Sequence, residues 1–298
     1  MEMKQAVLDL IPGRLVRIFA SPYVAGKGLI SGIRKAEELH LKQGLCTTLD
    51  LLGEEVVKAE EVNATVDLYY RMIEEAASKP YITISLKPTQ LGILQGEAEC
   101  QQNLRRIVAL AAPKGVRVTL DMEDHLLTDV TLRMFKAIRS EFDNFGIVLQ
   151  SRLFRTPEDI QALHLRPCRV RICIGIYREP SAIAYQDKPV MKQKLLECVK
   201  LLLDHGHYPE IATHDESLIR KCINYLDSLG VPKDDYEFQM LLGVPRTALQ
   251  QEIVKRGQVM RIYVPFAEEW EFAIHYLKRR LGANPFMLGM VVRNIFSR

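Results

Sequence analysis

The chain of 298 residues lacks the features that mark an exported, membrane-spanning or disulfide-stabilised protein. Its six cysteines form no C-x-x-C pair and follow no regular spacing, which argues against a disulfide framework and against a thiolate zinc site. No apolar run approaches the ~18 residues that suggest a membrane span. Charged residues interrupt the apolar N-terminal stretch, so we expect no signal peptide. These absences favour a soluble protein of a reduced, cytoplasmic compartment.

Positive and negative charges are nearly balanced along the chain. Forty basic and 37 acidic residues leave a net charge of only +3, so we expect no nucleic-acid partner. Apolar residues make up 48% and charged residues 26%, which is typical of a globular protein and excludes a disordered or collagen-like chain. No Pro-, Gly- or Ser-rich linker divides the sequence. We therefore expect a single domain over residues 1–298, near the upper size for one hydrophobic core.

Short β-rich runs alternate with amphipathic segments over most of the chain. The segments 54–77 and 190–206 have apolar residues at three- and four-residue spacing, as helices do. This alternation predicts a parallel sheet in an α/β protein, and eight units fit a closed (β/α)8 TIM-type barrel. We expect extra N-terminal helices over about residues 1–42, and last helices over about 267–298, to cover the active-site face. The expected strands are 46–52, 81–87, 116–122, 145–151, 169–175, 209–214, 236–242 and 259–265.

Most of the expected strands end in polar or charged residues. In a (β/α)8 barrel those ends converge on one face, where the active sites of this architecture lie. A single polar residue there often only caps the next helix, but eight together favour an enzyme. The residues are Asp50, Lys87, Asp121, Gln150, Arg171 to Gly175, Thr213 with His214, Gln239 and Tyr263.

The strand-end residues leave several chemistries open. Lys87 at a strand end suits a Schiff base, provided that its pKa is depressed. His214 and Asp121 are metal-ligand types, but no H-x-H pair supplies further ligands, and we expect no metal site. Arg279 and Arg280 lie in a segment with helical spacing after the last strand. They form either an exposed cationic helix end or a clamp for a carboxylate.

The glycines near the N-terminus do not form a dinucleotide-binding fingerprint. Gly26, Gly28 and Gly32 have the spacing G-x-G-x-x-x-G, and no expected strand leads into them, whereas the fingerprint needs a βαβ unit. We expect instead a turn that opens a helix.

Nine strings follow one another along the chain, namely VAGKGLISGIRKAEELHLKQGLCTTLDLLGEEV, SLKPTQLG, TLDMEDH, VLQSRL, RICIGIYREP, IATHDESLI, YEFQMLLGVP, RIYVPF and YLKRRLG. With these strings in this order, the sequence resembles the proline dehydrogenase family over nearly its whole length. The resemblance implies a distorted (βα)8 barrel that oxidises L-proline to 1-pyrroline-5-carboxylate. It also implies non-covalently bound FAD as the hydride acceptor and a membrane quinone as the final electron acceptor.

The resemblance also implies roles for individual residues. Lys87 with Arg279 and Arg280 would hold the proline carboxylate, Asp121 would be the active-site aspartate near Lys87, and Arg171 would lie beside flavin N5 and O4. Tyr263, Tyr276 and Leu241 would line the proline pocket together with Tyr177, which also belongs to the FAD set. The FAD contacts implied are Met122, Gln150, Arg171, Ile174, Gly175, Ile176, Tyr177, Thr213 and His214.

The chain departs from the family's usual motifs at three places. The fifth-strand motif K-G-A-Y is replaced by residues 174–177, which read I-G-I-Y, and Q-A-Y is replaced by residues 150–152, which read Q-S-R. Ala283 stands where the family has a glutamate that pairs with the arginine clamp. None of these changes removes a residue implied to take part in hydride transfer.

Two other functions stay open at this stage. One is a dehydrogenase of hydroxyproline or another cyclic imino acid, against which the bulk of Tyr263 argues. The other is a barrel that binds flavin or an amino acid without turnover. We expect a monofunctional enzyme without a fused downstream domain, whose product passes to a separate 1-pyrroline-5-carboxylate dehydrogenase. The tail 286–298 mixes large apolar residues with arginines, which suits either peripheral contact with the inner face of a membrane or a last helix packed on the barrel.

Overall fold

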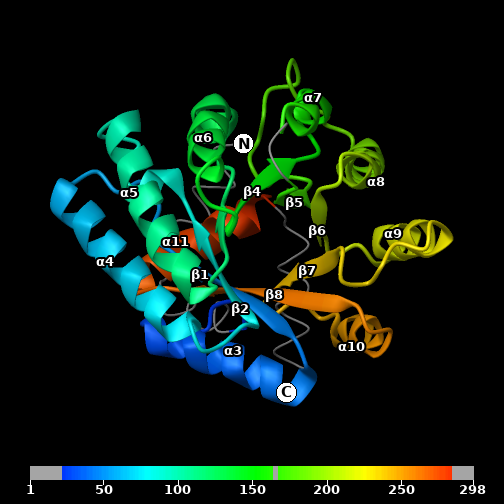
Figure 1. Cartoon of the computed structure of the whole chain (residues 1–298), viewed down its shortest axis with the longest axis horizontal. Helices are drawn as coiled ribbons and strands as arrows, with labels where there is room; N and C mark the ends of the chain where they lie inside the picture. The colour runs from blue at the N-terminus through cyan, green and yellow to red at the C-terminus, as the bar shows by residue number, and fades with distance from the viewer. Residues whose placement is uncertain (1–21, 164–166, 284–298) are drawn as a thin grey trace.

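Eight parallel strands close into a barrel in the computed structural model, which describes residues 22–163 and 167–283 (Figure 1). Each strand pairs with the next in chain order, and β8 pairs with β1. The sequence-based prediction of a (β/α)8 TIM-type barrel is therefore confirmed. The strands are β1 (Cys46–Leu51), β2 (Ile82–Leu86), β3 (Val118–Leu120), β4 (Phe145–Gln150), β5 (Arg169–Cys173), β6 (Tyr208–Ala212), β7 (Glu237–Leu241) and β8 (Val259–Phe266).

Helices surround the strands in Figure 1, and three of them begin at an aspartate whose side chain caps the first turn. The carboxylates of Asp124, Asp187 and Asp215 accept hydrogen bonds from the amides of Leu126, Val190 and Leu218 at 3.0, 3.0 and 2.8 Å, and so cap three helices. The helices are α3 (Leu29–Gln43), α4 (Ala59–Ala76), η1 (Pro88–Gln90), α5 (Glu97–Ala111), η2 (Ala112–Lys114), α6 (His125–Arg139), α7 (Thr156–Gln161), α8 (Lys188–Asp204), α9 (Glu216–Ser228), α10 (Thr247–Lys255) and α11 (Trp270–Ala283).

The strands present apolar side chains to the helices and polar ones to the inside of the barrel. Side chains alternate along a strand, so Leu49 and Ile84 pack in the layer between strands and helices while Asp50 and Ser85 face inward. Thr48 and Thr83 bond to each other across neighbouring strands at 2.9 Å. This period of two explains why polar residues at several strand ends reach one interior.

The helix that packs against β1 and β8 comes from the start of the described chain. Helix α3 packs on the outer wall of the barrel, where Gly32 lies against Leu49 and Phe266. Residues 1–21, the first half of the region in which we expected helices over the active-site face, lie outside the described residues. The expected turn at Gly26 to Gly28 does open α3, and Gly28 has the positive φ of 80° that glycine adopts without strain.

Helix α11 lies at the carboxyl ends of β1 and β8, and Figure 1 shows it (red) across the middle of the ring of strands. Its residues Ala273, Tyr276 and Leu277 pack with Leu52 and Ala267, which follow those two strands. The last described helix therefore packs at the carboxyl ends of these two strands.

The predicted helix at 54–77 begins later than its pattern indicated. Residues 54–58 form a loop in which Glu55 has a φ of 62° and the Val56 amide bonds to the Thr89 carbonyl at 3.0 Å. The loop is thus tied to η1, and α4 starts only at Ala59. Within residues 22–163 and 167–283, no helix combines the length and apolar character needed to cross a bilayer. The tail 286–298, for which the sequence left membrane contact and packing on the barrel both open, lies outside the described residues.

Candidate active site

Asp121 is the centre of a buried cluster at the carboxyl ends of β2, β3, β5 and β8. Its Oδ1 accepts hydrogen bonds from Arg171 Nη1 at 2.7 Å and from Ser85 Oγ at 3.1 Å. Its Oδ2 accepts one from the Tyr263 hydroxyl at 2.6 Å and lies 3.3 Å from Lys87 Nζ. Although burial raises the pKa of Asp121, the charges of Lys87 and Arg171 and the Tyr263 hydrogen bond lower it below its usual value. The carboxyl group is therefore ionised at neutral pH.

Lys87 is held in its charged form by two carboxylates. Its ammonium group pairs with Asp50 as well as Asp121, and it donates a hydrogen bond to the Tyr263 hydroxyl at 3.3 Å. Burial alone lowers the pKa of Lys87, but the charge of Asp50 and the neighbouring groups raise it well above the usual value. A Schiff-base lysine needs a depressed pKa, so this geometry argues against that chemistry.

Arg171 reaches from β5 across the inside of the barrel to Asp121. Its Nε donates to Gln239 Oε1 at 2.7 Å, and its Nη1 also donates to Ser85 Oγ at 3.0 Å. The guanidinium carbon lies 5.1 Å from the centre of the Tyr263 ring, within cation–π range. The remaining terminal nitrogen, Nη2, is buried and has no hydrogen-bond partner among the described residues.

A second polar group lies where β4 and β5 end side by side. Gln150 Nε2 donates to the carbonyl of Glu123 at 2.8 Å, while its Oε1 is buried without a partner in the described part of the chain. Gly175 follows β5 with a φ of 103°, and a Cβ there would collide with Gln150 Oε1. Glycine is required here for close approach. The buried donor on Arg171 and the buried acceptor on Gln150 fit the polar edge of a flavin, which the resemblance implied.

The other predicted FAD contacts lie around the same end of the barrel. Met122 is buried directly after Asp121, and residues 174–177 form a half-buried loop after β5. Thr213 Oγ1 accepts a hydrogen bond from the Asp215 amide at 3.2 Å, and the His214 carbonyl accepts one from Arg246 Nε at 3.3 Å. Both residues therefore also shape the start of α9, and their contact with FAD stays a prediction.

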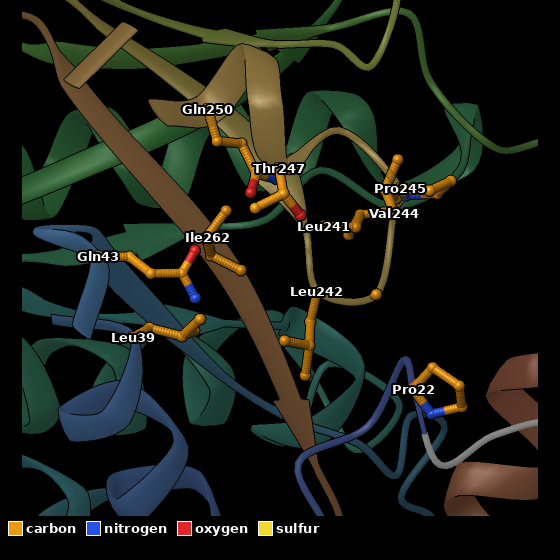
Figure 2. A pocket seen from close by; sticks show the side chains of 11 residues that line it. Pro22, Leu39, Gln43, Leu241, Leu242, Val244, Pro245, Thr247, Gln250 and Ile262 are labelled. Atoms are coloured by element: carbon orange, nitrogen blue, oxygen red, sulfur yellow. The ribbon is translucent and has the colours of Figure 1, made fainter. Parts of the chain in front are cut away.

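The predicted substrate-pocket residues are only partly brought together. Tyr263 contacts Lys87 and Asp121, and Tyr276 is buried in the cluster beneath α11. Leu241 ends β7 and lines a cavity of about 360 Å³ between α3, β8 and the loop that leads to α10, which Figure 2 shows. The backbone of α11 includes Arg279 and Arg280, but their side chains lie outside what the structure describes.

The barrel interior contains an ion network that our residue assignment did not include. Glu237 accepts from Arg261 Nε at 2.6 Å and pairs with Arg169 Nη2 at 2.5 Å, and Gln239 Nε2 donates to Glu237 at 2.6 Å and to Glu210 at 2.8 Å. Because both amide hydrogens of Gln239 face carboxylates, its oxygen must face Arg171. This network could have been predicted from the sequence, because polar residues at alternate positions of β5, β7 and β8 face the inside of the barrel.

Residues 22–163 and 167–283 contain no group of three His, Cys, Asp or Glu side chains that could hold a metal ion. His214 and Asp121, the two ligand types noted in the sequence, follow different strands, and Asp121 is already surrounded by Lys87, Arg171 and Tyr263.

A closed (β/α)8 barrel with a charged cluster at the carboxyl ends of its strands defines a barrel enzyme. The family model described as proline dehydrogenase matches residues 33–291, and the chain belongs to that family. Proline dehydrogenase 1 of Bacillus subtilis subsp. natto is 32% identical over 283 residues, covering 95% of this chain and 92% of the relative. Proline dehydrogenase of Deinococcus radiodurans is 36% identical over 285 residues, covering 93% and 90%.

Solved structures agree on the fold. Proline utilization A of Bdellovibrio bacteriovorus, in a crystal structure of the form inactivated by N-propargylglycine, superposes with a TM-score of 0.80 at 25% identity. The match covers 88% of this chain and 32% of that chain, so the present chain spans about a third of its length. Proline utilization A of Bradyrhizobium japonicum superposes with a TM-score of 0.74 at 20% identity, which shows the fold alone.

Proposed function

We propose that this chain is a proline dehydrogenase, which oxidises L-proline to 1-pyrroline-5-carboxylate with FAD as the cofactor. The observation that carries the proposal is the cluster of Lys87, Asp121 and Arg171 inside the barrel of a chain from this family. Bound FAD would supply the acceptor for the hydride that leaves proline. The protein's own part is to bind the amino acid, orient it and fix the charges around it.

Lys87 is the group we propose for the substrate carboxylate. It is charged, nine-tenths buried and held beside Asp121 and Tyr263, so a carboxylate meets a cation whose position is already fixed. We propose that Arg279 and Arg280 join it from α11, because that helix packs at the carboxyl ends of β1 and β8. Tyr263, Tyr276 and Leu241 would then surround the ring of proline. Asp121 would hold the charged groups of Lys87 and Arg171 in position through its two ion pairs.

Arg171 and Gln150 are the groups that we propose for the polar edge of the flavin. Each has one buried atom without a partner in the described residues, a donor on Arg171 and an acceptor on Gln150. Arg171 carries a permanent charge, which suits it to stabilise the negative charge that the cofactor gains. Met122, Thr213, His214 and the loop 174–177 complete the proposed set of FAD contacts.

The proposed electron acceptor after FAD is a membrane quinone, and the proposed next enzyme is a separate 1-pyrroline-5-carboxylate dehydrogenase. Reaching the quinone requires an encounter with a membrane surface, and co-sedimentation with liposomes measures it. The alternative substrate is 4-hydroxyproline. Tyr263 argues against it, because its hydroxyl already bonds to Asp121 at 2.6 Å and its ring occupies the space beside Lys87.

An anaerobic visible spectrum before and after addition of L-proline tests the function. Flavin bands that bleach with L-proline and return on addition of a soluble quinone are the expected result. L-Proline should bleach them faster than 4-hydroxyproline, and N-propargylglycine should inactivate the protein. Flavin bands that persist with L-proline would contradict L-proline as the substrate. Faster reduction by 4-hydroxyproline would favour that compound as the substrate. A protein that binds no FAD would contradict the whole proposal.

A further inference from the structure

Arg152 is a buried arginine beyond the end of β4, in the loop that lies beside the end of β5. Its amide donates to the Ile174 carbonyl at 3.3 Å, and its own carbonyl accepts from the Tyr185 amide at 2.8 Å. Its guanidinium donates through Nη1 to the Tyr177 carbonyl. A Cβ on Gly175 would lie only 3.0 Å from Arg152 Cδ, so the absence of a side chain at Gly175 makes room for this arginine.

The charge of Arg152 is unusual within the described part of the molecule. Four arginines there are nine-tenths or more buried, and the other three each have a carboxylate partner. Those pairs are Arg139–Asp143, Arg171–Asp121 and Arg261–Glu237. Arg152 forms no ion pair with any described carboxylate, and its buried Nε has no hydrogen-bond partner among the described residues.

An uncompensated buried charge is costly, because the low-dielectric interior does not replace the water that the ion has lost. The hydrogen bond to the Tyr177 carbonyl satisfies one donor of Arg152 but brings no negative charge. An anion would supply the negative charge that the described residues do not provide. A guanidinium fits an oxyanion with two acceptor oxygens, such as a phosphate group, through paired charge-assisted hydrogen bonds.

We propose that Arg152 binds the diphosphate of the dinucleotide cofactor. This inference rests on the proposed function, because the ligand, FAD, is the cofactor proposed there. Arg152 itself is not part of the family's usual motif. Arg171 lies inside the barrel on β5, whereas Arg152 lies beyond the end of the adjacent β4. Each of the two guanidinium groups thus has one buried nitrogen without a hydrogen-bond partner among the described residues, Nη2 on Arg171 and Nε on Arg152. The two residues lie at successive depths along one edge of the barrel, as a long ligand with a polar ring and a diphosphate requires.

Flavins that differ in phosphate content give a direct test with the full chain. The dissociation constants of FAD, FMN and riboflavin are measured by quenching of flavin fluorescence, for the wild type and for Arg152→Gln. Hydrogen bonds to a charged group contribute about 1.5–3 kcal/mol, so we expect FAD to bind roughly ten- to a hundredfold more weakly to Arg152→Gln. FMN should weaken as well, whereas riboflavin, which has no phosphate, should bind equally to both proteins.

Two controls separate charge from folding. Arg155→Gln removes a cation from the same loop, but one that Asp129 and Asp159 already neutralise at 2.6 and 2.8 Å, and FAD affinity should not change. Arg152→Lys keeps the charge and should bind FAD more tightly than Arg152→Gln. Inorganic phosphate should compete with FMN in the wild type and should not weaken riboflavin binding.

Each contrary outcome is distinct. Equal weakening of all three flavins by Arg152→Gln would show that Arg152 only supports the loop, and this would overturn the proposal. Unchanged FAD affinity would overturn it too, while leaving the proposed function intact. A wild-type chain that binds none of the three flavins would overturn both.

Discussion

Replacing Glu123 by glutamine should change how the stability of the protein depends on pH. Glu123 follows Met122 after β3 and is 5% exposed, and its carboxylate accepts hydrogen bonds from the Thr89 amide at 3.0 Å and the Thr89 hydroxyl at 2.7 Å. Burial raises the pKa of Glu123 to about 7, and the two hydrogen bonds from Thr89 offset only part of that effect.

The direction of the pH effect follows from proton binding. Because the pKa of Glu123 is higher in the folded protein than in the unfolded chain, the folded state binds more protons between about pH 4.5 and pH 7. Stability therefore falls as the pH rises through this window, the opposite of a carboxylate in an ion pair. Each pKa unit corresponds to about 1.4 kcal/mol, so ionising Glu123 costs the folded state about 3 kcal/mol.

Urea unfolding at pH 4.5 and at pH 8 measures this effect. Between the two pH values, the wild type should lose about 3 kcal/mol more of its free energy of unfolding than Glu123→Gln. Glu99→Gln, which changes an exposed carboxylate on α5, should follow the wild type. Taking the difference between proteins cancels other titrating groups, such as Asp50, whose pKa burial raises to about 6. Wild type and Glu123→Gln curves that run parallel would refute the reasoning.

The interior ion network gives two further predictions. Glu237→Leu leaves Arg261 buried without its carboxylate, and urea unfolding should show a free energy of unfolding lower by about 3–5 kcal/mol. The double variant Glu237→Leu with Arg261→Leu should regain most of that loss. A double variant less stable than the single one would contradict this. Gln239→Leu removes the acceptor of Arg171 Nε, and kcat for L-proline should fall roughly tenfold or more, with a smaller change in KM. An unchanged kcat would show that Gln239 does not position Arg171.

The residues of the central cluster were predictable because two simple rules place them. Parallel strands bring their carboxyl ends to one face, and alternation along each strand directs every second side chain inward. These rules apply to Lys87, Arg171 and Tyr263, each of which the structure brings within hydrogen-bonding or ion-pair distance of Asp121. Such rules depend only on chain geometry and topology, so a sequence contains enough information to apply them.

Pairings across the barrel and the placement of helices were not predictable in the same way. The charged state of Lys87 depends on its ion pair with Asp50. The sequence places both residues at strand ends but does not show that their side chains contact each other. Helical periodicity shows that α3 has an apolar face but not which wall that face covers. In the sequence, Arg152 was visible only as an added positive charge. Its burial depends on the close approach of Gly175, whose φ of 103° could not be predicted from a motif.

The position of α3 has a consequence for the order in which the barrel is completed. This helix is synthesised before every strand, yet its buried side chains Leu29, Ile33 and Ala36 belong to the core that also contains Phe266 of the last strand. Contacts between segments so distant in sequence form slowly. On the ribosome α3 can pack on β1 early, but the part of its apolar face that contacts β8 stays uncovered until β8 has emerged. That interval is when the nascent chain is most prone to aggregate or to need a chaperone.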